Sequence, residues 1–162
     1  MQESKLFDFN NNIDISQWRI VNDFVMGGIS KSEFLVDQNN GVFRGSVSLE
    51  NNGGFAMVKY TFPKINIADF SKIKISLKGD TKNYQVRIKE NSTQKHSYIH
   101  PFKATNEWQD IEFILQDFIP MYRVRKMELT NFQENSISEI VFLIGNKKSE
   151  DFELRLNKIE LL

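Results

Sequence analysis

Apolar and polar residues alternate one by one along much of this chain. In residues 72–78, Ile73, Ile75 and Leu77 fall on one side of an extended strand, and the polar residues between them fall on the other. Residues 83–89 repeat the pattern. One apolar and one polar side on each strand are typical of antiparallel sheets that face water on one side.

Turn-forming clusters of Asn, Asp, Gly and Ser separate these segments at intervals of roughly 10 to 15 residues. This spacing predicts an all-β fold, a sandwich of two antiparallel sheets. Helical periodicity is scarce: residues 114–119 predict a single turn before Pro120, and residues 125–132 a second short piece. No repeat or linker divides the chain, so residues 1–162 are expected to form one domain.

Composition supports one sizeable core and excludes one class of partner. The 162 residues are 40% hydrophobic and include 14 Phe, which provide a large aromatic core. The 21 basic residues are balanced by 21 acidic ones, whereas nucleic-acid-binding proteins usually carry a basic excess. We therefore expect no nucleic-acid partner.

The chain contains no cysteine, which excludes disulfides, thiolate metal sites and a thiol nucleophile. Its first residues lack the basic and apolar regions of a secretory signal. The longest apolar runs, of four or five residues, are too short to span a membrane. These features predict a soluble cytoplasmic protein that is not an integral membrane protein.

No pattern in the sequence indicates catalysis. His96 and His100 lie among strand-forming residues, where the strand rise places them roughly 13 Å apart, too far to share a zinc ion. Ser30 is not part of a nucleophile elbow, and none of the glycine pairs has phosphate-loop spacing. Any two of the acidic residues can converge in the folded chain. A hydrolase therefore stays open as a third, weaker alternative. We predict that the protein is not an enzyme and has no catalytic residues.

Two pairs of adjacent glycines interrupt the alternating segments, and adjacent glycines permit positive φ angles or close backbone approach. They belong to two motifs, formed by Trp18, Asn22, Asp23, Met26, Gly27, Gly28 and Ser30, and by Asn51, Gly53, Gly54 and Phe55. This pattern resembles the complex I intermediate-associated protein 30 family, whose core has the form W-x-x-x-N-D-x-x-M-G-G-x-S followed by N-x-G-G-F. Later elements, including Lys78-Gly79-Asp80 with Tyr84, and Trp108, extend the resemblance over nearly the whole chain.

The resemblance implies a galactose-binding-like jelly roll and a role as a chaperone in the assembly of the respiratory NADH dehydrogenase complex. The implied partners are subunits of that complex. Domains of this fold can also hold a structural calcium ion, and Asp8, Asn10, Asn12 and Asp14 alternate like the ligands of a calcium loop. The Gly and Glu that an EF-hand loop requires are missing. No metal or cofactor is therefore predicted, and a structural calcium site stays open.

Amides, carboxylates, an Arg and aromatic rings are the groups with which a protein surface recognises a sugar or a partner. The candidate binding residues of these types are Asn22, Asp23, Asn51, Asn52, Asp80, Tyr84 and Arg87. The alternative for the Asn and Asp residues is turn formation through their own backbone. Trp18 and Trp108 are expected to anchor the core. The leading hypothesis is a non-catalytic assembly factor, and the alternative is a carbohydrate-binding module that binds a glycan.

Overall fold

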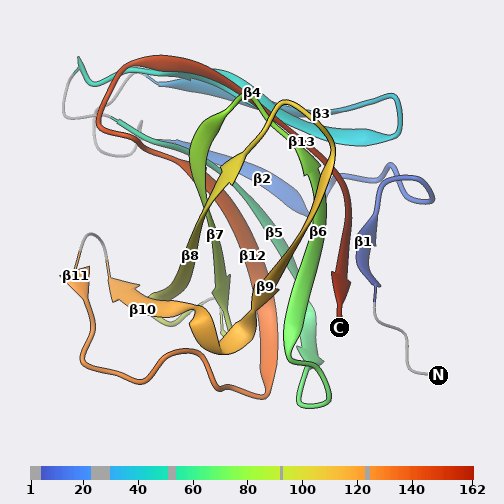
Figure 1. The fold of residues 1–162 in the computed structure, drawn as a ribbon, viewed down its shortest axis with the longest axis vertical. Helices are drawn as coiled ribbons and strands as arrows, with labels where there is room; N and C mark the ends of the chain where they lie inside the picture. Colours follow the sequence, from blue (N-terminus) through green and yellow to red (C-terminus); the bar gives the residue numbers. More distant parts are fainter. Residues whose placement is uncertain (1–4, 23–29, 51–53, 92, 123–124) are drawn as a thin grey trace.

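The computed structural model describes residues 5–22, 30–50, 54–91, 93–122 and 125–162. The strands within these ranges form two antiparallel sheets that enclose one hydrophobic core (Figure 1). The prediction of an all-β sandwich is therefore confirmed.

The first sheet has six strands in the order β3-β4-β13-β6-β9, and β1 also pairs with β13. Its strands are β1 (Lys5–Asp8), β3 (Lys31–Asp37), β4 (Asn40–Val47), β6 (Lys72–Lys78), β9 (Gln109–Ile114) and β13 (Glu150–Leu161).

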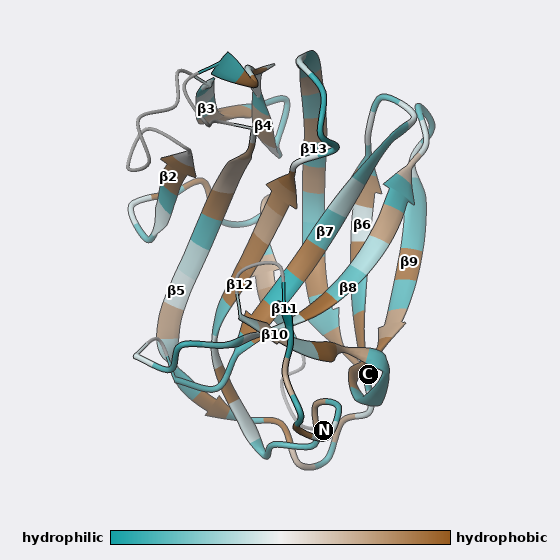
Figure 2. Cartoon of the chain, turned by 90° about the vertical axis from the view of Figure 1, so that its left-hand side faces the viewer, coloured by the Kyte–Doolittle hydropathy of each residue, from teal (hydrophilic) through white to brown (hydrophobic). Residues whose placement is uncertain are grey.

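The second sheet has seven strands in the order β11-β10-β8-β7-β12-β5-β2. Its strands are β2 (Trp18–Asn22), β5 (Ala56–Asn66), β7 (Lys82–Lys89), β8 (Ser97–Ala104), β10 (Ile119–Tyr122), β11 (Arg125–Lys126) and β12 (Ser136–Ile144). Figure 2 views the molecule from the side of this sheet, with β5, β12, β7 and β8 in front.

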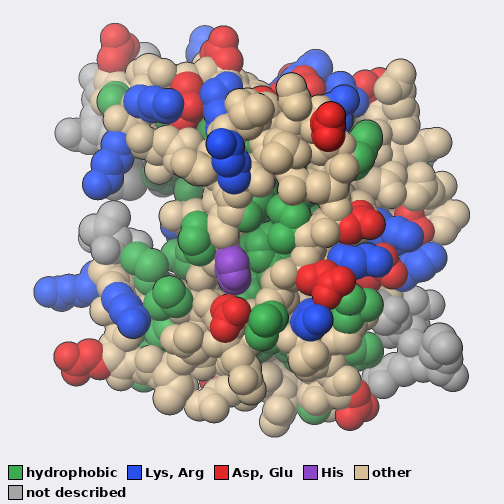
Figure 3. Space-filling model, viewed as in Figure 1, with side chains coloured by type: hydrophobic (Ala, Val, Ile, Leu, Met, Phe, Trp, Pro, Cys, Tyr) green, Lys and Arg blue, Asp and Glu red, His purple; other side chains and the backbone are tan. Residues whose placement is uncertain are grey.

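The alternating positions predicted to be apolar do line the core. Ile73, Ile75 and Leu77 on β6 are fully buried, as are Val86 and Ile88 on β7. Figure 3 looks onto the edge of the sandwich between β8 and β9, where hydrophobic side chains are visible between the two layers. The core thus lies between the sheets, and each sheet turns its other face outward.

Trp18 anchors the core, as predicted. Its ring is 7% exposed and lies between Tyr60 and Phe34, with ring centroids 4.7 Å away on each side and nearly parallel planes. Phe7 meets the indole edge-on at 5.4 Å. Stacked and edge-on contacts of this kind add to the stabilisation that burial provides.

The expectation that Trp108 also anchors the core is wrong. Trp108 is 47% exposed and lies in the connection from β8 to β9. Ile111 and Phe113 of β9 face the core, so the alternate residues Asp110 and Glu112 face outward, and Trp108, directly before the strand, has the same parity as these two. Strand parity therefore places this ring on the outer side of the six-stranded sheet.

One of the two expected helical pieces is present. Leu115–Asp117 form a single 3-10 turn directly before β10, within the segment where one turn was predicted. Residues 125–132 are not helical, which corrects the second expectation. Arg125 and Lys126 pair with β10, and the Met127 amide donates to the Pro120 carbonyl, so these backbone groups bond to a neighbouring strand.

Candidate functional site

The outward faces of the two sheets differ in how their charges are partnered. On the six-stranded sheet, basic and acidic side chains pair across neighbouring strands. Examples are Arg44 with Glu33 at 2.7 Å and Lys72 with Glu112 at 3.0 Å. Figure 3 shows basic and acidic groups interleaved over β1, β6 and β13. These charges on the six-stranded face therefore neutralise one another in pairs.

The outward face of the seven-stranded sheet is organised around β12. Residues 137–144 of this strand are buried on both of its sides. Because Ile140 and Phe142 belong to the core, Val141 and Leu143 point to the outer face. The outward face of β12 therefore has large apolar side chains that are covered by their neighbours in the chain.

Arg87 lies next to this apolar strip. The strand register places it between Ile99 on β8 and Val141 on β12. Its Nε and Nη2 atoms donate hydrogen bonds of 3.1 and 2.9 Å to the Gln85 side-chain oxygen. Among the described residues no carboxylate pairs with it, and burial lowers the pKa of the Arg87 guanidinium. Arg87 is thus a fixed, half-buried cation whose charge is not neutralised by an ion pair.

Glu139, two residues before Val141, is the next outward-facing residue of β12 and lies opposite Lys89 on β7 and Thr61 on β5. It is only 4% exposed. Its buried Oε2 atom has no hydrogen-bond partner in the described part of the chain. A buried polar atom without a partner costs roughly 1–3 kcal/mol, so such atoms are rare unless something else binds them.

Lys89 completes the cluster. Burial lowers the pKa of the Lys89 ammonium, Glu139 opposes that shift, and the charges of Lys59 and Arg87 add to it. The Lys89 ammonium also donates to the Gln94 carbonyl at 3.1 Å. Lys59 and Arg87 thus act on the Lys89 ammonium, which lies opposite the buried Glu139 carboxylate. We call Lys59, Arg87, Lys89 and Glu139 the charged cluster of the seven-stranded face.

Only Arg87 of the predicted binding residues belongs to this cluster. The Tyr84 hydroxyl donates to Asp80 at 2.9 Å, and the same carboxylate accepts from the Glu153 amide at 2.8 Å. These contacts favour a structural role for Asp80 and Tyr84. Asn22 ends β2, paired with Ala56. Asp23, Asn51 and Asn52 lie outside the described residues.

The predicted structural motif is described only in part, since Met26, Gly27, Gly28 and Gly53 also lie outside the described residues. The Ser30 hydroxyl accepts from the Ser48 amide at 2.9 Å, which joins the start of β3 to the end of β4. Gly54 has a φ of 141°, a conformation that favours glycine. Phe55 next to it is half-buried.

Lys59, Lys89 and Glu139 were missed by the sequence analysis. Each is a charged residue within a strand, and local pattern alone assigns charged positions to solvent. The signal that distinguishes them is the strand order β7-β12-β5, which sets three separate segments side by side. That order is not contained in any local pattern.

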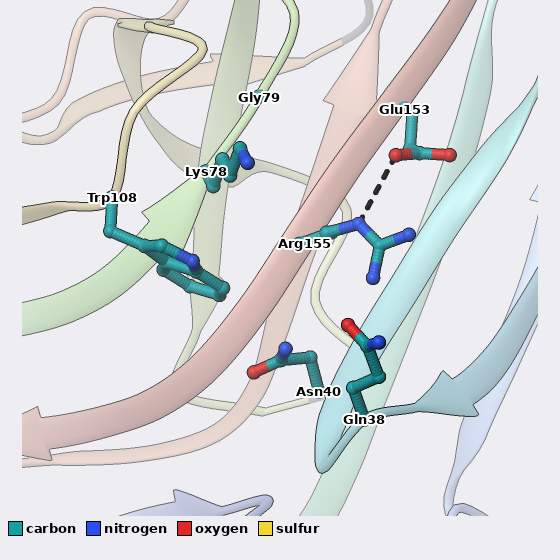
Figure 4. Close-up of a pocket in the computed structure, with 7 residues that line it drawn as sticks. All are labelled: Gln38, Asn40, Lys78, Gly79, Trp108, Glu153 and Arg155. Carbon is teal, nitrogen blue, oxygen red and sulfur yellow. Dashed lines mark hydrogen bonds and ion pairs between the residues drawn. The ribbon is translucent and has the colours of Figure 1, made fainter.

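A hollow lies on the outer face of the six-stranded sheet and has a volume of about 320 Å³. Figure 4 shows the residues that line it, Gln38, Asn40, Lys78, Gly79, Trp108, Glu153 and Arg155. It includes the exposed Trp108 ring. The described residues contain no group of three or more His, Asp or Glu side chains placed to hold a metal ion. They also contain no helix long and apolar enough to cross a membrane.

The fold places the chain in the class of galactose-binding-like β-sandwiches, to which carbohydrate-binding modules also belong. The sequence profile of the complex I intermediate-associated protein 30 family matches residues 7–156. The chain therefore belongs to the complex I intermediate-associated protein 30 family, as its motifs indicated. No curated protein matches the chain closely enough in sequence to count as a relative.

Similar solved structures come from carbohydrate-active proteins. The family 11 carbohydrate-binding module of the cellulosomal cellulase Lic26A-Cel5E of Clostridium thermocellum has a TM-score of 0.75 at 15% identity, covering 100% of this chain and 95% of the module. The module in complex with a β-1,3-1,4-mixed-linked tetrasaccharide has a TM-score of 0.73 at 16% identity, covering 100% and 97%. The agarase AgWH50C has a TM-score of 0.62 at 13% identity, covering 98% of this chain and 24% of the agarase. At these identities the likeness establishes the fold alone.

Proposed function

We propose that this protein is a non-catalytic binding protein that acts as an assembly factor, and that it holds a partner subunit against the outer face of its seven-stranded sheet. Membership of the complex I intermediate-associated protein 30 family supports this role and makes subunits of the respiratory NADH dehydrogenase complex the expected partners. The absence of a catalytic pattern in the sequence fits the same role.

The charged cluster carries the proposal. Arg87 has no carboxylate partner and the buried Glu139 oxygen has no hydrogen-bond partner among the described residues, whereas charges such as Arg44 and Lys72 on the six-stranded face are paired. Charged groups held in a partly dry surface give stronger and more specific contacts to a complementary partner than charges in open water. A partner with a carboxylate next to Arg87 and a hydrogen-bond donor next to Glu139 would give each of these two side chains the partner that it lacks.

The net charge of the cluster predicts the charge of the complementary partner surface. Lys59, Arg87 and Lys89 outnumber Glu139, and Val141 and Leu143 lie beside them. The matching surface is acidic overall, with apolar side chains beside the acidic ones and one hydrogen-bond donor for Glu139. Electrostatic complementarity of this kind accelerates encounter and excludes wrong partners.

The test compares three forms of the tagged protein purified from its own cells after mild cross-linking, with partners identified by mass spectrometry. They are the wild type, Arg87→Met and Arg44→Met. Met keeps the apolar stem of either Arg, and Arg44 lies in an exposed ion pair on the opposite sheet. We expect NADH dehydrogenase subunits with the wild type and with Arg44→Met.

For Arg87→Met we expect recovery to fall about tenfold or more, because removing one member of a desolvated charge pair costs roughly 2–5 kcal/mol of binding. Glu139→Gln is expected to weaken recovery as well. Equal recovery with Arg87→Met, or the absence of any specific partner of the wild type, would contradict the proposal.

The alternative, a carbohydrate-binding module, does not suit the seven-stranded face. The outward positions within the described strands β8, β7, β12, β5 and β2 carry no aromatic ring on which a sugar could stack. The observation that favours sugar binding is the exposed Trp108 beside the hollow on the other sheet. It supports a separate site, not the assembly role.

A further inference from the structure

The hollow on the six-stranded sheet contains a large aromatic ring on an otherwise charged surface. Trp108 is about half exposed, although tryptophan is a residue that folded chains mostly bury. Figure 4 shows its ring pointing along the hollow toward Arg155 and Asn40. An indole held in this way presents a flat apolar surface next to polar groups, and this combination suits the C–H face of a pyranose ring.

The polar groups around the ring are held in place. Arg155 donates to Glu153 and to Asp37, at 3.1 Å each, so its planar guanidinium is fixed. The hairpin between β3 and β4 turns at Gln38 and Asn39, which both have positive φ angles of 52° and 61°. This tight turn directs Gln38 and Asn40 to the same hollow.

Several of these polar groups have hydrogen-bond donors or acceptors that a ligand could use. The Gln38 amide and the Lys78 ammonium have no hydrogen-bond or ion-pair partner in the described residues. The Asn40 side-chain oxygen accepts from Asn157 at 3.0 Å, and its amide protons are not used by that bond. Planar amides and a cation that converge on one hollow are the donors and acceptors that sugar hydroxyls require.

The charge and size of the hollow limit the ligand. Arg155 is neutralised by Glu153 and Asp37, which leaves Lys78 against a surface that is close to balanced. A neutral ligand therefore fits better than a phosphate or a sulfate. The volume of about 320 Å³ lies at the lower end of ligand pockets and suits one or two sugar rings.

We propose that this hollow is a second binding site, for a neutral saccharide whose pyranose ring packs against Trp108 and whose hydroxyls bind Gln38, Asn40 and Lys78. This inference goes beyond the proposed assembly role. It concerns the opposite sheet from the charged cluster, and the two sites can be tested separately.

The test uses intrinsic fluorescence, because the chain has only two tryptophans and the other, Trp18, is buried. The purified protein is titrated with neutral tetrasaccharides, namely mixed-linked β-1,3-1,4-glucan, cello-, manno- and agaro-oligosaccharides, up to millimolar concentration. We expect at least one to change the Trp108 emission and to give saturable binding heat in calorimetry.

Variants locate the binding. Trp108→Ala is expected to weaken affinity at least about tenfold, since a central aromatic anchor dominates binding energy. Trp108→Phe retains part of the affinity, and Leu129→Ala, an equally exposed apolar position elsewhere, leaves it unchanged. No binding by any saccharide in the panel, or binding that persists in Trp108→Ala, overturns the inference. Partner capture by Trp108→Ala stays at the wild-type level in either case, so failure of this site is distinguishable from failure of the assembly role.

Discussion

The hydroxyl of Tyr84 donates a hydrogen bond of 2.9 Å to the carboxylate of Asp80, which joins the inside of β7 to the turn that precedes it. The same carboxylate accepts from the Glu153 amide at 2.8 Å, so it also links the turn to β13 in the other sheet. Burial, and then the charge of Asp80, raise the pKa of Tyr84. Two residues selected from the sequence as binding candidates thus connect the two layers of the sandwich.

Replacing Asp80 is therefore expected to destabilise the fold more than replacing Tyr84. Asp80→Ala removes the acceptor of two partly buried hydrogen bonds, and bonds to a charged group contribute roughly 1.5–3 kcal/mol each. Tyr84→Phe keeps the ring and removes one bond, at a cost of about 1–2 kcal/mol. Denaturant unfolding followed by circular dichroism measures both. Equal stability of Asp80→Ala and wild type would show that the link is not needed.

Arg87→Met is expected to raise the free energy of unfolding by about 1 kcal/mol while it lowers partner capture. A buried cation without a carboxylate costs desolvation, and an apolar side chain of similar length often replaces such an ion at no loss or with a gain. It also relieves repulsion on Lys89. Arg44→Met is the matched control and is expected to lose up to about 0.5 kcal/mol, because its ion pair is exposed. A clear loss of stability in Arg87→Met would mean that Arg87 has a structural function instead.

A carboxyl pair makes stability depend on pH. A hydrogen bond with Glu90, together with burial and the Glu90 charge, raises the pKa of Glu134 above its ordinary value of 4.5. The folded state therefore binds this proton more tightly than the unfolded state, and the resulting stability is present below pH 4.5 and lost as pH rises through the folded pKa.

Glu134→Gln removes this dependence. We expect the variant to be more stable than the wild type at pH 7 and to lose that advantage at about pH 4, since the wild-type carboxyl is then protonated. Thermal unfolding at the two pH values measures the difference. A constant difference at both pH values would exclude the shared proton.

Gly45 allows β3 to approach β4. A Cβ at this position would overlap the Lys31 carbonyl oxygen and come within 2.6 Å of the Ser32 Cα atom. Because these are backbone atoms, Gly45→Ala is expected to destabilise the protein by about 1–3 kcal/mol. At Gly145 the nearest atom to a Cβ is the Gly54 oxygen at 3.2 Å, so Gly145→Ala is expected to cost less. Chemical denaturation of the two variants tests this order.

Much of the fold could be predicted from local pattern. Alternation located strands such as β6 and β7 and assigned their buried positions, because side chains of a strand point to opposite faces whatever its neighbours are. The same rule, applied to Ile111 and Phe113, predicts the outward position of Trp108. The general preference of tryptophan for the core favours the opposite, buried position, and here strand parity outweighs it. Residues 125–132 were misassigned because the backbone of residues 125–127 bonds to β10, which local periodicity does not reveal.

The sequence by itself determined the all-β class, strands such as β6 and β7 with their core positions, and the family, since these depend on spacing and on motifs within short stretches. That residues 1–162 form one domain, act in the cytoplasm and catalyse nothing stays a prediction. Only the tertiary structure decided that Arg87, Lys89, Lys59 and Glu139 form one cluster. These residues come from β7, β5 and β12, and their proximity depends on long-range strand pairing, while burial of a charge depends on everything packed around it.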